Sequence, residues 1–271
     1  MKYITAFFMA WGNFFAVPCP CKLWDNNLRR LQLVFFPLIG LLMGVLWYLL
    51  YRGMALINIP LQLKAAAMTI YPFAISGFIH LDGFMDCCDA IMSRRELEER
   101  QRILKDSHVG AFAVISVIIL FIIYYSAMWA AIEPEAIINA AGLESFQLWG
   151  LVLIPFVSRA CSAYGVLNFV PIGHSQYKAS YDEKINRQYG LVLNLMIFVV
   201  ITIAAIIPAI ASYSYSDIGA ESAITAIVTT VVTHHLMMFY GRKQLGGMSG
   251  DIAGYALTIS ECAGVLVLAI L

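Results

Sequence analysis

Seven long apolar stretches constrain this chain more than any other feature of its sequence. A helix needs roughly 20 residues to cross the hydrocarbon core of a bilayer, and the stretches have about that length. A soluble globule also needs a charged shell, whereas this chain is 61% hydrophobic and only 13% charged. The sequence therefore predicts an all-α integral membrane protein whose surroundings are a lipid bilayer. The predicted spans are residues 33–50, 61–79, 110–132, 146–168, 189–212, 220–241 and 252–271.

The N-terminal apolar segment, residues 3–18, is shorter than these spans and runs into Pro18 and Pro20. It lacks the charge and cleavage-site layout of a cleavable signal. We interpret it as an interfacial or re-entrant helix packed on the bundle, and a further spanning helix is the alternative. Since no soluble domain or low-complexity linker is visible, residues 1–271 are predicted to form a single polytopic membrane domain, a helical bundle of about seven transmembrane helices.

The basic residues predict how the chain is oriented. Alternate connections carry 14 of the 17 Lys and Arg residues, and basic residues mark the cytoplasmic side of a membrane protein. We therefore expect a multi-pass protein of the cytoplasmic (inner) membrane with these connections in the cytoplasm. Because the acidic residues also number 17, no excess charge suggests a nucleic-acid partner. The basic connections are residues 1–32, 80–109, 169–188 and 242–251.

The longest basic connection, residues 80–109, is the predicted catalytic segment, and it opens with an aspartate cluster. On a helix Asp82, Asp86 and Asp89 would lie within roughly 60° of one another. Three such carboxylates repel one another unless a cation holds them, and carboxylate oxygens together with substrate phosphates suit Mg²⁺, with Mn²⁺ as a second choice. We predict a catalytic metal site at these aspartates, with His80 beside it as a further catalytic candidate. The alternative is a solvated acidic face on a loop.

The same connection ends in a second polar group, Lys105, Asp106 and Ser107, where the chain enters the next span. A helix N-terminus with a nearby lysine is a natural phosphate site. These residues are therefore candidate phosphate ligands. The alternative is that Asp106 or Ser107 only caps the helix and that Lys105 only marks the cytoplasmic side.

A glycine-rich loop precedes the last span. Gly246, Gly247 and Gly250 would let backbone amides approach a bound phosphate, and Ser249 could cap the following helix. Asp251 could add a carboxylate to the metal site or accept a proton. Glycines also serve ordinary turns. The loop is therefore a candidate phosphate site mainly because it is predicted to face the aspartates at the same membrane boundary.

Ionisable residues within the predicted spans are a further signal, because charges in a bilayer usually face a cavity or a partner. Arg159 is a candidate for neutralising a diphosphate, and Glu261 could pair with it or with Lys64. A purely structural ion pair is the alternative. The adjacent His234 and His235 fit a local hydrogen bond better than a ligand site.

Taken together, these motifs resemble the pattern of the cobalamin synthase family. They are HLDGFMDCCDA at 80–90, KDSHVG at 105–110, LGGMSGD at 245–251, FPLIG at 36–40 and VSR at 157–159. Their order matches the family over essentially the whole chain. Three features depart from the family pattern: His108 stands in place of the usual Arg, Thr258 in place of a common Glu, and residues 168–174 lack a Gly-Leu-Gly stretch.

The resemblance implies a late step of cobalamin (vitamin B12) biosynthesis, the assembly of the nucleotide loop. Such an enzyme joins adenosylcobinamide-GDP to α-ribazole, or to its 5'-phosphate, and releases GMP. An alcohol oxygen would attack the phosphorus on the cobinamide arm. The metal would offset the diphosphate charge, and Lys105, Arg159 and the loop amides would hold the leaving phosphate. Either Asp89 or Asp251 would take the hydroxyl proton. A homo-oligomer, or association with other cobalamin-assembly enzymes, is left open.

Three other classes were weighed. A CDP-alcohol phosphotransferase also uses an Asp-Gly-led aspartate set, but Asp86 and Cys87 occupy the positions of that family's Ala-Arg pair. An aspartate-rich prenyltransferase ordinarily needs two aspartate-rich loops, and one is found. A transporter would line a path across the bilayer with charge, whereas the polar residues here collect on one side.

Overall fold

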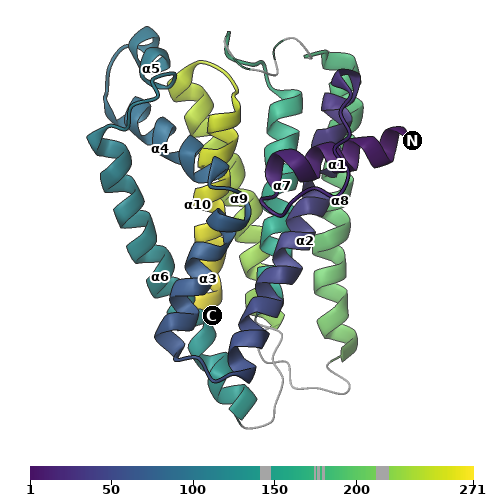
Figure 1. The fold of residues 1–271 in the computed structure, drawn as a ribbon, viewed down its shortest axis with the longest axis vertical. Coiled ribbons are helices and arrows are strands. Elements are labelled where there is room, and N and C mark those ends of the chain that lie inside the picture. The colour runs from purple at the N-terminus through teal and green to yellow at the C-terminus, as the bar shows by residue number, and fades with distance from the viewer. Residues whose placement is uncertain (141–147, 174, 176–177, 179–180, 212–219) are drawn as a thin grey trace.

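The computed structural model describes residues 1–140, 148–173, 175, 178, 181–211 and 220–271. These residues form ten α-helices and one short 3-10 helix, η1, arranged as one elongated bundle (Figure 1). The all-α prediction is confirmed. In chain order the elements are α1 (Lys2–Phe14), η1 (Asn26–Leu28), α2 (Arg29–Leu56), α3 (Leu61–Ile75), α4 (Ile79–Met92), α5 (Leu97–Ile103), α6 (Ala111–Ala140), α7 (Trp149–Asn168), α8 (Glu183–Ala211), α9 (Ala220–Leu245) and α10 (Gly250–Ile270).

Within the part of the chain that the structure describes, six helical segments are long and apolar enough to cross a membrane. They agree with six of the seven predicted spans, so a multi-pass membrane protein is confirmed at this level. The segments are Asn26–Leu56, Ala111–Pro134, Trp149–Asn168, Glu183–Ile206, Glu221–Leu245 and Gly250–Ile270.

The predicted span 61–79 is not among these segments. Helix α3 ends at Ile75 after 15 residues, which is about 22 Å of helix at 1.5 Å per residue. Gly77 then adopts a left-handed φ of 64°, and the amide of Phe78 donates to the carbonyl of Phe73 at 2.8 Å. This is the Schellman ending that a glycine favours. A helix-stop signal at Gly77 therefore divides the apolar stretch into α3 and the start of α4.

Helices α7 and α10 form the centre of the bundle, since 89% and 72% of the residues in their most apolar 18-residue stretches are buried. In the corresponding stretches of α6 and α8, only 28% and 17% of the residues are buried. Exposed side chains such as Ile118 and Ile122 on α6 and Leu195 and Phe198 on α8 give these helices an apolar outer surface. This is the surface expected to face lipid.

Two glycines let α2 lie directly against the backbone of α7. A Cβ atom at Gly40 would come 2.3 Å from the carbonyl oxygen of Pro155, and one at Gly44 would come 2.1 Å from that of Val152. Glycines four residues apart form one small stripe on a helix, which allows close packing in membranes. Gly40 belongs to the FPLIG motif, so part of that motif serves helix packing.

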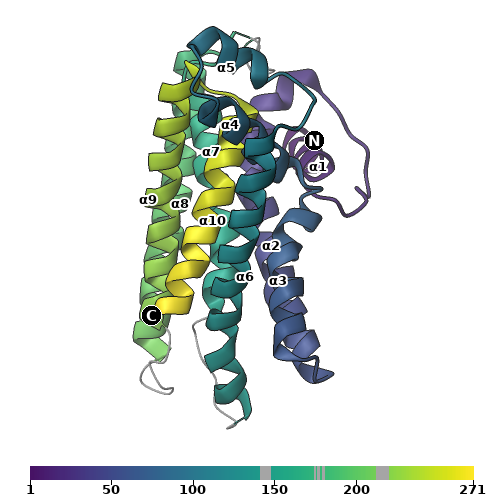
Figure 2. The ribbon, with the colours of Figure 1, turned by 90° about the vertical axis from the view of Figure 1, so that its left-hand side faces the viewer.

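The two short helices α1 and α4 run across the long axis of the bundle instead of along it (Figures 1 and 2). Helix α1 packs on α2, where Phe14 and Phe36 have ring centroids 4.3 Å apart and Gln32 donates to the carbonyl of Met9 at 3.2 Å. Its crosswise course agrees with the interfacial or re-entrant interpretation of residues 3–18 and not with a further span.

The basic connections gather at one end of the bundle. Helix α5, the turn between α9 and α10 and the beginning of α2 lie at the upper end in Figure 1, whereas the turn between α2 and α3 lies at the lower end. For these connections the alternation inferred from the sequence is reproduced in space, whereas the connections near 133–145, 169–188 and 213–219 lie partly or wholly outside the described residues. Both crosswise helices lie toward this upper end.

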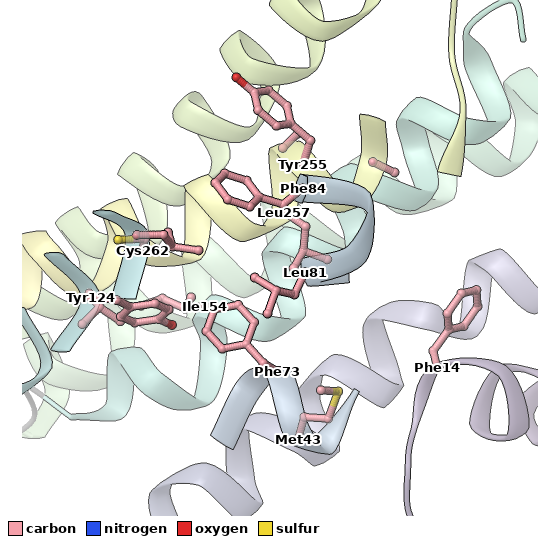
Figure 3. Packing of buried hydrophobic residues seen from close by; sticks show 14 of the residues in the cluster. Phe14, Met43, Phe73, Leu81, Phe84, Tyr124, Ile154, Tyr255, Leu257 and Cys262 are labelled. Atoms are coloured by element: carbon pink, nitrogen blue, oxygen red, sulfur yellow. The ribbon is translucent and has the colours of Figure 1, made fainter. Parts of the chain in front are cut away.

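Apolar side chains from α4 and α10 fix α4 in place (Figure 3). Phe84 stacks on Tyr255 with ring centroids 6.0 Å apart, and Leu81 and Leu257 are buried in the same cluster. Because aromatic and aliphatic burial is the main favourable term in packing, this contact anchors the aspartate-bearing helix on a central helix of the bundle.

Candidate active site

The aspartate helix and the last helix approach each other so closely that glycine is needed on both sides. A Cβ atom at Gly83 would lie 2.8 Å from Cα of Asp251, and one at Gly254 would lie 3.0 Å from the carbonyl oxygen of His80. Thr258 donates to that carbonyl oxygen at 3.2 Å. The close contact at Gly83 thus brings Asp82 of the first motif near Gly250 and Asp251 of the last motif, although the two motifs are far apart in the chain.

This contact allows a prediction about Gly83. Replacing it by alanine pushes a methyl group into the backbone of α10, which cannot give way as a flexible side chain could. We expect Gly83→Ala to lower the unfolding temperature and to reduce activity at least tenfold, since α4 must shift relative to Asp251. Gly53→Ala is the matched control, because nothing lies within 4 Å of a Cβ at that helical position. Equal stability and activity of the two variants would contradict the packing role.

Near the α4–α10 contact, Asp86 lies within electrostatic range of three other carboxylates. Burial, together with the charges of Asp82, Asp251 and Asp89, raises the pKa of Asp86 to about 7. Neighbouring carboxylates disfavour each other's ionised form, and a cation bound among them would relieve this repulsion. Asp82, Asp86 and Asp89 lie on α4 and Asp251 lies on α10, and the joint binding of a metal by the first three stays a prediction.

Asp89 differs from its neighbours in what it contacts. One carboxylate oxygen accepts from the amide of Gly110 at 2.6 Å and the other from the amide of Ala113 at 3.0 Å. These amides begin α6, so Asp89 caps that helix from α4 and neutralises its partial positive charge. Its assignment as a metal ligand stays a prediction, and the structure gives it this second role.

The cap that the sequence suggested for α6 was wrong. Neither Asp106 nor Ser107 lies at the helix N-terminus, because α6 begins at Ala111. Asp106 instead accepts from the backbone amide of His108 at 3.0 Å and contacts the imidazole Nδ1 at 2.6 Å. A carboxylate on another helix took the capping role, and local sequence cannot reveal such a partner.

Lys105, Asp106 and Ser107 are exposed on the loop between α5 and α6. The bond to His108 lowers the pKa of Asp106, with the neighbouring charges of His108 and Arg102 adding to the effect. None of the three residues lines the cavity described next. Their phosphate-binding role stays a prediction that requires the phosphate to extend toward this loop.

A cavity of about 110 Å³ lies beside the carboxylates, between α1, α2, α4, α7 and α10. Its polar lining includes three residues of the predicted site, Asp82, Asp251 and His80, and Gly250 of the glycine loop. Apolar side chains complete the wall. They are Phe14, Leu33, Phe36, Ile79, Ala163, Val166 and Ala253.

His80 is buried in this wall, with 8% of its surface exposed. Its ring stacks on that of Phe14 with centroids 6.5 Å apart, and its Nε2 atom has no hydrogen-bond partner among the described residues. Burial, together with the charge of Arg159, lowers the pKa of His80 well below its usual value. The imidazole is therefore neutral, with one nitrogen available to a ligand.

The glycine loop divides into two parts. Ser249 caps α10 by accepting from the amide of Ile252 at 3.3 Å and donates to the carboxylate of Asp251 at 3.2 Å, which confirms the predicted cap. Gly250 lines the cavity. The phosphate-binding roles of Ser249 and Gly250 stay predictions.

The other part of the loop, Gly246 and Gly247, packs elsewhere. A Cβ at Gly246 would come 3.1 Å from the side chain of Gln101 on α5, and one at Gly247 would come equally close to the backbone of Ile172. Neither glycine lines the cavity. In this structure their freedom serves the turn that joins α9 to α10, for which Gly246 has a φ of 80°.

Arg159 is completely buried and paired with Glu261 at 2.5 Å. Ser158 donates to the same carboxylate oxygen at 2.6 Å. The sequence left open whether Glu261 pairs with Arg159 or with Lys64, and in the structure it pairs with Arg159. Such a buried pair has the geometry of a purely structural ion pair, the alternative to a role in diphosphate binding. Arg159 does not line the cavity, so its role as a diphosphate ligand stays untested.

Sequence reasoning missed one polar pair in the cavity wall. Ser162 lines the cavity, and its hydroxyl lies 2.8 Å from Nε2 of His234 on α9. No motif contains Ser162. The adjacent histidines within an apolar span were the only signal, and they did not indicate a partner on α7.

Fold and site together define a class of protein, a polytopic helical membrane protein with a carboxylate-lined cavity at one end of its bundle. A family model described as cobalamin-5-phosphate synthase matches residues 6–269. The chain therefore belongs to that family. No solved structure matches the chain.

Curated relatives agree over their full lengths. The chain is 32% identical to the adenosylcobinamide-GDP ribazoletransferase of Clostridium perfringens strain 13, over 99% of both chains. It is 35% identical to the protein of the same name from Clostridium botulinum strain Alaska E43, over 95% of this chain and 94% of the relative. A Pseudomonas fluorescens protein of that name is 28% identical over 88% of each.

Proposed function

We propose that this chain is an adenosylcobinamide-GDP ribazoletransferase, acting in the last steps of cobalamin biosynthesis. It joins adenosylcobinamide-GDP to α-ribazole, or its 5'-phosphate, and releases GMP. The observation that carries the proposal is the meeting of Asp82 and Asp251 beside one cavity, in a chain that matches its family from residue 6 to residue 269. The two aspartates belong to the two motifs on which the family resemblance chiefly rests.

The carboxylates fit a divalent cation by their chemistry. Burial and the neighbouring carboxylates raise the pKa of Asp86, although in the described residues no three His, Cys, Asp or Glu side chains are grouped so that they could hold a metal ion by themselves. Mg²⁺ ordinarily binds to one or two carboxylates together with substrate phosphates and water, so an open set suits it. Asp82 and Asp86 would hold the ion, with Asp89 as a further candidate, which leaves Asp251 free of the ion to act as a base. When bound, Mg²⁺ supplies charge neutralisation to a diphosphate.

The protein groups supply binding and proton transfer. A hydroxyl of the acceptor attacks the phosphorus on the cobinamide arm, the bond from that phosphorus to the GMP oxygen breaks, and GMP departs. Asp251 lines the cavity, whereas both oxygens of Asp89 accept backbone amides. Of the two candidate bases, Asp251 is therefore better placed to take the hydroxyl proton. Its hydrogen bond from Ser249 orients the carboxylate.

We place the active site on the cytoplasmic face. The support is the collection of basic segments at the end of the bundle that carries α4 and α5. Adenosylcobinamide-GDP is charged and cannot cross a sealed bilayer unaided. Inside-out vesicles should therefore carry out transfer without detergent, and right-side-out vesicles only after permeabilisation. The reverse pattern would place the site on the other face.

The test of the function is transfer by the purified, detergent-solubilised protein. With Mg²⁺ we expect a cobalamin product and GMP in equal amounts. EDTA should reduce the rate by on the order of 10³-fold, since a catalytic cation stabilises the transition state by several kcal/mol. Added Mg²⁺ should restore the rate, and Mn²⁺ should restore it in part. Unchanged transfer in EDTA would contradict the metal assignment, and absence of product from folded protein would contradict the function.

A further inference from the structure

The cavity is somewhat smaller than one known to accept a small ring, so it has room for a single ring-sized group at most. An engineered apolar cavity of about 150 Å³ accepts benzene, and the cavity here has about 110 Å³. It therefore holds one part of a substrate, while the remainder extends out past Asp82. Its lining says which part this is.

The lining favours a neutral, hydroxyl-bearing group over a phosphate. No Lys or Arg is among the described residues that line the cavity, and two carboxylates are. Arg159 lies outside the lining and is paired with Glu261. A cation held at the exposed Asp82 would bind the phosphates at that side of the cavity, whereas a phosphate deeper in this wall would meet no basic side chain in a poorly hydrated space. Apolar side chains with a few polar atoms are instead what a ring with hydroxyl groups requires.

Ser162 is the polar group of α7 in this wall, and its orientation is set by His234. Both side chains are buried, with 2% and 0% of their surfaces exposed. The Ser162 hydroxyl lies 2.8 Å from Nε2 of His234 and makes a longer contact of 3.4 Å to the carbonyl oxygen of Ala253. A serine held from two sides cannot rotate freely.

The position of the proton on the His234 ring determines whether the Ser162 hydroxyl can donate a hydrogen bond to a ligand or accept one from it. Nδ1 of His234 has no partner among the described residues, and a buried unpaired N–H donor is rarer than a buried unpaired acceptor. The proton therefore belongs on Nε2, which donates to Ser162. Ser162 then directs its own proton toward Ala253, and one lone pair of its oxygen remains for a donor in the cavity. Nε2 of His80 is a second polar atom of the wall without a partner among the described residues.

From these contacts we propose that Ser162, oriented by His234, binds a hydroxyl of the substrate that brings the attacking oxygen, the acceptor nucleoside. The inference rests on the proposed function and assigns the cavity to one of its two substrates. The apolar wall around Phe14 and Phe36 packs against the rest of the ring-sized group, and Asp251 lies on the same cavity for the proton transfer. Ser162 is a binding residue, and His234 is a positioning residue that acts through it.

The first experiment compares Ser162→Ala with Ser260→Ala. Ser260 is also fully buried and also donates to a backbone carbonyl, that of Leu257 at 2.9 Å, but it does not line the cavity. Loss of one hydrogen bond should raise the KM for α-ribazole and its calorimetric Kd about tenfold in Ser162→Ala. The KM for adenosylcobinamide-GDP should stay within about twofold. Ser260→Ala should change none of these values.

The second experiment tests His234. His234→Gln keeps an N–H donor near the position of Nε2 and should retain most of the affinity for α-ribazole. His234→Leu should reproduce the loss in Ser162→Ala. Because His234 acts through Ser162, the double variant Ser162→Ala with His234→Leu should be no weaker than either single variant. A purely structural histidine would give additive losses and no rescue by glutamine.

The outcomes separate this inference from the function beneath it. If the wild-type protein gives no transfer, both the proposed function and the assignment of the cavity to the acceptor nucleoside are contradicted. If the wild type transfers but Ser162→Ala binds α-ribazole normally, or loses affinity for adenosylcobinamide-GDP instead, only the cavity assignment is overturned. Ser162→Cys, which conserves volume and offers a weak hydrogen bond, supplies the same readout if the alanine variant does not fold.

Discussion

Replacing Asp82 by alanine is expected to abolish transfer, with kcat/KM falling by about 10³-fold or more. Asp82 is exposed at the cavity, on the face of α4 turned toward Asp251 and the other carboxylates. Removing it takes away a ligand of the proposed cation and part of the stabilisation of the diphosphate, worth several kcal/mol. The measurement is the initial rate of cobalamin formation at saturating Mg²⁺.

A control separates this loss from a general effect of charge. Glu98 on α5 is exposed at the same end of the bundle and does not line the cavity. Glu98→Gln should keep wild-type activity, and the unfolding temperature of Asp82→Ala should not fall, since the exposed Asp82 contributes repulsion and not packing. An Asp82→Ala enzyme with more than a tenth of wild-type activity would rule out Asp82 as an essential ligand.

The largest expected effect on stability comes from breaking the buried pair of Arg159 and Glu261. Glu261→Leu leaves the guanidinium buried without its counter-charge, which typically costs about 3–5 kcal/mol. We expect the Tm of the detergent-solubilised protein to fall on the order of 10 °C. Glu221→Gln, an exposed acidic residue at the beginning of α9, should leave Tm unchanged.

The double variant Arg159→Met with Glu261→Leu distinguishes the two roles considered for Arg159. A buried ion pair can be exchanged for apolar side chains of similar volume with little loss of stability, so the double variant should recover most of the lost Tm. Activity then decides the question. Recovered stability with near-normal transfer assigns Arg159 to structure, whereas recovered stability with a raised KM for adenosylcobinamide-GDP assigns it to the diphosphate. No recovery of Tm in the double variant would contradict the ion-pair account.

Span prediction succeeded where hydropathy alone decides the outcome. Six apolar stretches form long helices because every backbone amide in lipid must be bonded within its own segment. The stretch 61–79 failed because it contains an ending, at Gly77, that hydropathy does not measure. The result is a short helix followed by α4, which runs across the bundle and carries the aspartates to α10.

The predicted site residues are only partly brought together by the structure. Asp82, Asp251 and His80 meet at one cavity, but Asp89 is committed to the first amides of α6, and Gly246 and Gly247 pack against α5 and the 170–172 segment. A motif shows that residues are needed near one another. It does not say which of them faces the ligand and which supports a neighbouring helix.

The sequence by itself determined the class of fold, the end of the bundle where the polar residues collect and the aspartates of the site. These follow from length, hydropathy and spacing, which are local properties of the chain. Only the tertiary structure decided that Gly83 and Gly254 let α4 meet α10, that Glu261 takes Arg159 and that His234 orients Ser162. These contacts join residues 72 to 178 positions apart. Such pairings depend on which helix faces pack together, and periodicity within one segment cannot specify that.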